Sequence, residues 1–189
     1  MSNESQSGAR TLYVIVCGAG PAADVATLVQ FAQLRGWRVC VATTPAGREF
    51  VEAGELERLT GYPVRTEFRK PSDPEPSWPM ADAILVAPAT INTVCKWAAG
   101  IADNLVLSML FECMGVDVPV VVAPNVNPAL ARHPAFQRSV ADLQSWGVRV
   151  LYEHSAPPPV WMASWERIMN ELGGAAGGGR GPSKPPEPC

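Results

Sequence analysis

Short apolar runs alternate with amphipathic segments along most of this chain. The run at 12–17, LYVIVC, is unbroken, rich in β-branched residues and followed by a glycine turn, which is typical of a strand buried on both faces. The segment 22–35 instead spaces its apolar residues three and four positions apart, which predicts a helix with one buried stripe. The same criteria predict strands at 12–17, 37–42, 83–87, 118–123 and 148–152, and helices at 22–35, 45–51, from about 92, and at 101–114, 135–146 and 160–172.

Strands that alternate with helices favour an α/β fold with a doubly wound parallel sheet, Rossmann-like or flavodoxin-like. The chain has 189 residues, of which 47% are apolar and 17% charged. A domain of this size buries about 70% of its unfolded surface, so one domain suffices. We expect a disordered start at 1–10, one α/β domain at 11–172, and a disordered Gly- and Pro-rich tail at 173–189. The proline-rich stretch 60–79 is predicted to be a loop with one short strand at 64–68.

Charge and cysteine content exclude several classes of function. The net charge of −3 gives no basic stripe for nucleic acid and no polybasic membrane anchor. No apolar run approaches the ~18 residues of a membrane span, and the polar start lacks the apolar centre of a signal peptide, so we expect a cytoplasmic protein. Five irregularly spaced cysteines favour neither a disulfide framework nor a zinc site.

Polar and glycine-rich segments follow the predicted strands. In a doubly wound sheet these segments converge at the carboxyl ends of the strands, where ligands bind. A helix that opens near Asn92 and Thr93 offers free backbone N–H groups to an anion, although either side chain could simply cap the helix. The turn at Gly18 and Gly20 fits a phosphate site and a bare tight turn equally well. The candidate contacts at the strand ends are Gly18, Gly20, Thr43, Thr44, Thr90, Asn92, Thr93, Asn125 and Asn127.

Two motifs resemble those of a known family. PATINT at 88–93 is followed seven residues later by GIADN at 100–104, and this pair is similar to the PASANT and GIADN elements of the homo-oligomeric flavin-containing cysteine decarboxylases. PNVNPAL at 124–130 resembles that family's PAMNxxM segment, and His133 and Pro134 match the HP that commonly follows. The family includes phosphopantothenoylcysteine decarboxylase and the lantibiotic peptidyl-cysteine decarboxylases.

The resemblance implies flavin mononucleotide (FMN) as cofactor and a homo-oligomer built from trimers. It implies oxidation of a cysteine at its β-carbon followed by loss of carbon dioxide. Asn127 matches the substrate-binding amide, although an asparagine before Pro128 could also start a turn. Thr43 and Thr44 match positions that contact the flavin after the second strand, with helix capping as the alternative. Asn92 would hold the flavin or its loop.

Two departures from the family pattern bear on the chemistry. The family's catalytic histidine precedes PASANT by about sixteen residues, but this chain has no histidine before His133, and the matching place holds Asp73 and Glu75. Asp73 is the candidate substitute base, with a solvated loop carboxylate as the alternative. The CGxxGxGR clamp of the coenzyme A branch is also absent, since the matching region reads YEHSAPPPVWMASWER at 152–167.

The missing clamp favours a peptide ending in cysteine as substrate, with an enethiol as product. Phosphopantothenoylcysteine decarboxylation is an alternative, and the absent histidine keeps open a non-catalytic flavin-binding regulatory protein. The sequence predicts no metal site.

Overall fold

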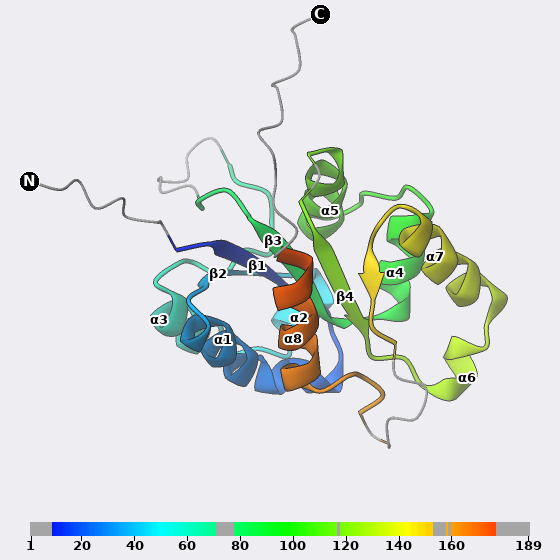
Figure 1. The fold of residues 1–189 in the computed structure, drawn as a ribbon, viewed down its shortest axis with the longest axis horizontal. Coiled ribbons are helices and arrows are strands. Elements are labelled where there is room, and N and C mark those ends of the chain that lie inside the picture. Colours follow the sequence, from blue (N-terminus) through cyan, green and yellow to red (C-terminus); the bar gives the residue numbers. More distant parts are fainter. Residues whose placement is uncertain (1–8, 71–77, 117, 153–157, 159, 177–189) are drawn as a thin grey trace, which may run out of the picture.

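One parallel sheet forms the centre of the protein. The computed structural model describes residues 9–70, 78–116, 118–152, 158 and 160–176. Five strands run in the order β2-β1-β3-β4-β5, and every neighbouring pair is parallel (Figure 1). The strands are β1 (Thr11–Val16), β2 (Arg38–Thr43), β3 (Ala83–Ala89), β4 (Val120–Pro124) and β5 (Arg149–Val150). This strand order is the flavodoxin-like one, which confirms the predicted fold class.

Helices cover both faces of the sheet (Figure 1). One face carries α1, α3 and α8, and the other carries α4, α5 and α7. The helices are the 3₁₀ turn η1 (Gly20–Asp24), α1 (Val25–Leu34), α2 (Pro45–Arg48), α3 (Ala53–Thr60), α4 (Ile91–Ala98), α5 (Leu105–Gly115), α6 (Pro128–Ala131), α7 (Pro134–Ser145) and α8 (Trp165–Ala176).

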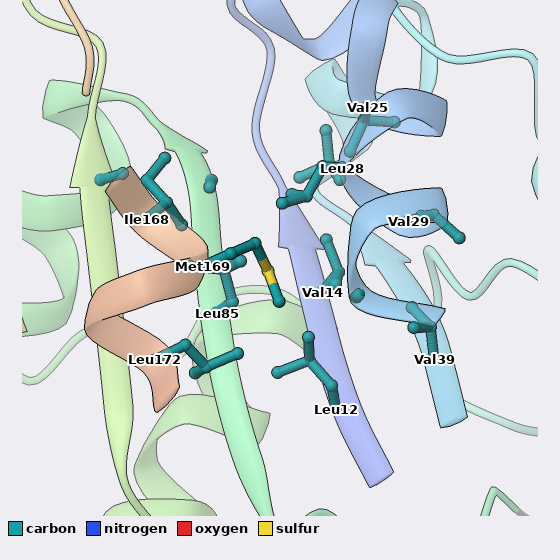
Figure 2. Close-up of a cluster of buried hydrophobic side chains, with 14 of the residues drawn as sticks. Leu12, Val14, Val25, Leu28, Val29, Val39, Leu85, Ile168, Met169 and Leu172 are labelled. Atoms are coloured by element: carbon teal, nitrogen blue, oxygen red, sulfur yellow. The ribbon is translucent and has the colours of Figure 1, made fainter. Parts of the chain in front are cut away.

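The strands divide their side chains between two buried clusters. Leu12 and Val14 of β1 face α1 and α8, whereas Ile15 lies in the cluster under α4, α5 and α7. Figure 2 shows the first cluster, in which Leu85 of β3 lies beneath Met169 of α8. Side chains buried on both faces explain why these strands read as unbroken apolar runs.

Several element boundaries differ from the prediction. Helix α5 begins at Leu105 rather than at 101, because the Asn104 side chain accepts a hydrogen bond from Leu107 N and caps the helix there. Helix α8 covers 165–176 instead of 160–172, and α3 was not predicted at all. The strand predicted at 64–68 is reduced to a single bridge between Ala42 and Arg65. The disordered ends were predicted at 1–10 and 173–189, but helix α8 extends through 173–176, and residues 9–10 are also described. Residues 1–8 and 177–189 lie outside the described residues.

Candidate functional site

A polar pocket lies at the carboxyl edge of the sheet. Its volume is about 440 Å³, within the roughly 300–1,000 Å³ of ordinary ligand pockets. It is bounded by the turn after β1, by α2, by the first turns of α4 and by the start of α5. The lining residues are Gly18, Thr44, Pro45, Ala46, Thr90, Asn92, Thr93, Lys96, Asp103, Asn104 and Leu107.

The first turn of α4 forms one wall of the pocket. Helix α4 begins at Ile91, because the hydroxyl of Thr90 accepts a hydrogen bond from Thr93 N and acts as the cap. The prediction had placed this start one or two residues later. Asn92 therefore stands inside the first turn, and its side chain is not the cap. The N–H groups of Ile91 and Asn92 have no acceptor one turn earlier, as is general at helix starts.

Hydroxyl groups connect this wall to the end of β1. Thr90 Oγ1 and Thr93 Oγ1 lie 3.2 Å apart, and the Cys17 thiol donates to Thr93 Oγ1 over 3.3 Å. Burial raises the pKa of Cys17, so this cysteine stays a neutral thiol. It is a packing and hydrogen-bonding residue, and it is not an activated nucleophile.

Two glycines allow the backbone of β1 and α2 to approach each other closely. A Cβ atom added at Gly18 would lie 3.0 Å from Ala46 Cβ, and one added at Gly47 would lie 2.3 Å from Val16 O. Thr44 caps α2 by accepting from Gly47 N over 2.9 Å. These contacts hold α2, whose residues Pro45 and Ala46 line the pocket, directly against the end of β1.

One ion pair stands at the rim. Lys96 donates to Asp103, and Asn104 donates to the other oxygen of the same carboxylate. These contacts lower the pKa of Asp103, with the hydrogen bond from Lys96 as the main cause. The pair leaves the pocket lining with no net formal charge.

The pocket contains five of the candidate contacts, namely Gly18, Thr44, Thr90, Asn92 and Thr93. It does not include Gly20, Thr43, Asn125 or Asn127. Thr43 is fully buried, and its hydroxyl lies 2.7 Å from that of Thr66. A Cβ atom at Gly20 would meet nothing within 4 Å.

Both asparagines after β4 are held by local hydrogen bonds. Asn127 is half-buried, and its Oδ1 accepts from Leu130 N over 2.9 Å, which caps the short helix α6. Asn125 Oδ1 accepts from Trp161 N over 2.8 Å. In each case the amide oxygen is occupied, and the Nδ2 group has no hydrogen-bond partner among the described residues.

The candidate base lies outside the described residues, because Asp73 and Glu75 fall within 71–77. His133 caps α7 by accepting from Ala135 N through Nδ1 over 3.1 Å. Among the residues that the structure describes, no cluster of His, Cys, Asp or Glu could hold a metal ion.

Sequence reasoning did not select Lys96, Asp103 or Asn104 as site residues. Asp103 and Asn104 belong to the GIADN segment, so the motif itself was an available signal. Lys96 follows Asn92 by one helical turn and lies on the same face of α4.

Comparisons with known proteins place this geometry in a family. A family model described as Flavoprotein matches residues 1–176. A probable phosphopantothenoylcysteine decarboxylase of Streptococcus mutans is 29% identical over 152 residues, which are 78% of this chain and 84% of that protein. The coenzyme A biosynthesis bifunctional protein CoaBC of Escherichia coli is 31% identical over 71% of this chain, but the chain spans only 34% of CoaBC.

Solved structures share the fold over nearly the whole chain. The FMN-dependent cysteine decarboxylase SpaF superposes with a TM-score of 0.75 at 23% identity, covering 90% of this chain and 96% of SpaF. The FMN-dependent cysteine decarboxylase TvaF, from thioviridamide biosynthesis, gives a TM-score of 0.70 at 27% identity, covering 89% of this chain and 99% of TvaF.

None of the helices in the described part of this chain is long and apolar enough to cross a membrane.

Proposed function

Because this chain belongs to the Flavoprotein family, we propose that it is an FMN-dependent enzyme that oxidatively decarboxylates the C-terminal cysteine of a peptide. The observation that carries the proposal is the pocket at the carboxyl ends of the strands, lined by both family-like motif segments after β3. The fold shared with SpaF and TvaF supports the cysteine as the reacting group.

The pocket fits the phosphate and sugar part of FMN. It offers free N–H groups at the start of α4 and hydroxyls of Thr44 and Thr93, and Gly18 lets α2 pack closely against the end of β1 beside them. Its one carboxylate, Asp103, is already paired with Lys96. A donor-rich lining without a free negative charge suits a phosphate group.

We assign the remaining predicted contacts to the same cofactor and its surroundings. None of these residues lines the pocket. They would contact the cofactor at the rim or support the pocket wall from behind, and they are Gly20, Thr43 and Asn125. The chemistry that FMN supplies when bound is acceptance of a hydride from the cysteine β-carbon. The net change in the peptide is loss of carbon dioxide and two hydrogens.

Asn127 is the proposed substrate-binding residue. Its Oδ1 is fixed by Leu130 N, so the amide plane is held and Nδ2 is left to donate. A neutral donor can orient a carboxylate without the positive charge that would stabilise it against departure. The same hydrogen bond caps α6, so capping and substrate binding are compatible here.

The residue that replaces the family histidine is proposed to be Asp73, with Glu75 as the alternative. The support is their position in the sequence before the PATINT segment. Asp73→Asn and Glu75→Gln separate the two: the variant that removes the base loses turnover and keeps FMN, and the other keeps both.

A second candidate substrate is phosphopantothenoylcysteine. The S. mutans relative, which is 29% identical over most of both chains, favours it. The absent CGxxGxGR clamp favours the peptide. A peptide ending in cysteine and phosphopantothenoylcysteine, offered in parallel to the same preparation, distinguish the two.

We also propose a homo-oligomer, a trimer or a multiple of three. Its support is the apolar width of α5, in which Phe111, Cys113 and Met114 are half-buried in addition to the five fully buried residues. A ring forms when one patch of a subunit fits a different patch of the next. Light scattering that gives a monomer at micromolar concentration would contradict it.

The test of the main proposal uses the purified full chain. We expect a yellow protein that releases FMN on denaturation and that lowers the mass of cysteine-ending peptides by about 46 Da, the mass of carbon dioxide and two hydrogens.

Asn127→Asp places a negative charge against the substrate carboxylate and should abolish turnover while FMN stays bound. Asn92→Ala should instead weaken FMN binding, by roughly 2- to 13-fold if one neutral hydrogen bond is lost. A colourless protein that takes up no added FMN would refute the proposal.

A further inference from the structure

The side chains of Cys17, Thr93 and Thr90 form a chain of hydrogen bonds that runs from the end of β1 to the pocket. The Cys17 thiol donates to Thr93 Oγ1 over 3.3 Å, and Thr93 Oγ1 lies 3.2 Å from Thr90 Oγ1. Thr90 Oγ1 also accepts from Thr93 N over 3.4 Å. Both threonines line the pocket, whereas Cys17 stands behind them and does not. We name these three residues the thiol–hydroxyl chain.

Backbone contacts hold both ends of the thiol–hydroxyl chain in place. Cys17 is fully buried, and its N–H donates to Pro88 O over 3.0 Å, which ties the end of β1 to β3. Burial also raises the pKa of its thiol, so the S–H proton is retained. Thr93 is only 5% exposed, and Val94 N donates to Thr90 O over 3.1 Å in the first turn of α4. The sulfur and the two hydroxyl groups are therefore held by contacts that need no ligand.

A count of protons gives the direction in which the thiol–hydroxyl chain donates. Its three side chains carry three protons, one on the sulfur and one on each hydroxyl oxygen. The S–H proton is used at Thr93, and one hydroxyl proton is used between Thr93 and Thr90. One hydroxyl proton then remains, and no residue in the described part of the chain accepts it. Because both hydroxyl groups line the pocket, this proton is available to a ligand there.

We infer that Cys17 is a positioning residue for the cofactor: by donating to Thr93 it makes the pair of threonine hydroxyls donate one proton to an oxygen atom of FMN. The inference rests on the proposed function, because it takes the pocket to be the FMN site. A sulfur that accepted from Thr93 would instead draw that hydroxyl proton away from the pocket. The phosphate and ring carbonyl oxygens of FMN accept hydrogen bonds, so a hydroxyl fixed as a donor binds them better than one that is free to turn away.

The first measurement is the infrared S–H stretching band of Cys17, which is the band that disappears in Cys17→Ala. In the parent protein this band should lie at lower frequency than the band of an unbonded thiol, because the proton is donated to oxygen. Thr93→Val keeps the shape of the side chain and removes the acceptor, so the band should move up to the frequency of an unbonded thiol. A band that Thr93→Val does not move would overturn the assignment of Cys17 as the donor.

The second measurement is the Kd of FMN, obtained by fluorescence titration of the full chain after its cofactor has been removed. Cys17→Ala should raise this Kd by about 2- to 13-fold, the range for one neutral hydrogen bond. In a Thr93→Val background the same substitution should change the Kd by less than about twofold, because the thiol acts through that hydroxyl. Cys40→Ala is the matched control and should leave the Kd the same, since Cys40 is also fully buried, lies in the neighbouring strand β2 and does not line the pocket.

The two backgrounds separate positioning from packing. An equal rise in Kd for Cys17→Ala in both backgrounds would assign the effect to the smaller side chain and overturn the positioning role. A Kd that Cys17→Ala leaves unchanged in the parent background would overturn it as well. A parent protein that takes up no FMN would refute the proposed function and with it the role toward the cofactor, whereas the infrared band would still decide whether Cys17 donates to Thr93.

Discussion

The close approach of α2 to β1 makes Gly47 the position where one added methyl group should do most harm to the pocket. A Cβ atom there would lie 2.3 Å from Val16 O, which is about 0.7 Å inside the 3.0 Å that real Cβ atoms keep. The obstacle is backbone, and Val16 O also accepts the Thr44 N–H over 3.0 Å. Gly47→Ala must therefore push α2 away from the sheet. Overpacking of this kind costs about 1–3 kcal/mol of unfolding free energy.

Gly54→Ala is the matched control. Gly54 is an exposed residue in the first turn of α3, and a Cβ atom added there meets nothing within 4 Å. Alanine at such a site stabilises by about 0.4–1 kcal/mol. Urea titrations of the two variants should differ by roughly 1.5–4 kcal/mol. Gly47→Ala should also lose FMN on gel filtration, because Thr44 and Ala46 line the pocket. A Gly47→Ala protein as stable as the Gly54→Ala protein would refute the reasoning.

Three further outcomes are expected. Leu85→Ala empties a fully buried site in β3 and should lower the urea unfolding free energy by about 2–5 kcal/mol. Asp103→Asn leaves Lys96 unpaired and should tighten FMN binding, whereas Lys96→Met should weaken it; fluorescence titration should show both effects shrinking at high salt. Burial raises the pKa of Cys40 from 9.0 to about 12, so the unfolded state loses this proton first as pH rises. The contribution of Cys40 to the unfolding free energy should therefore be constant below about pH 9.0 and should decrease between about pH 9.0 and about pH 12. Denaturant midpoints measured across that range should fall less steeply for Cys40→Ala than for the parent protein.

The apolar pattern was sufficient to predict the sheet, because strands buried on both faces give continuous apolar runs that few other structures give. It was insufficient for α3, whose two turns bury one leucine, Leu56, among mostly charged and small residues. It also misplaced the start of α5, since Ile101 continues the apolar run but is 44% exposed, and the cap at Asn104 decides where the helix begins.

The site was predictable where it depends on local chain geometry. Gly18, Thr90 and Asn92 lie in the pocket because each follows directly on a strand end. Side-chain direction was not predictable where the partner is remote in sequence. Thr43 turns to Thr66, 23 residues away, and Asn125 turns to Trp161, 36 residues away. The residues next to Thr43 and Asn125 in the sequence give no indication of these distant hydrogen-bond partners.

The position of α8 has a consequence for how the chain is made. Ile168, Met169 and Leu172 complete the buried cluster on the α1 side of the sheet, above β3 and β4 (Figure 2). Those strands end at Ala89 and Pro124, more than forty residues before Trp165 begins α8. At ribosomal rates of about 5–20 residues per second, the nascent sheet would show an uncovered apolar strip for some seconds. The strands at the centre of the finished enzyme are thus the surface that most needs protection during synthesis.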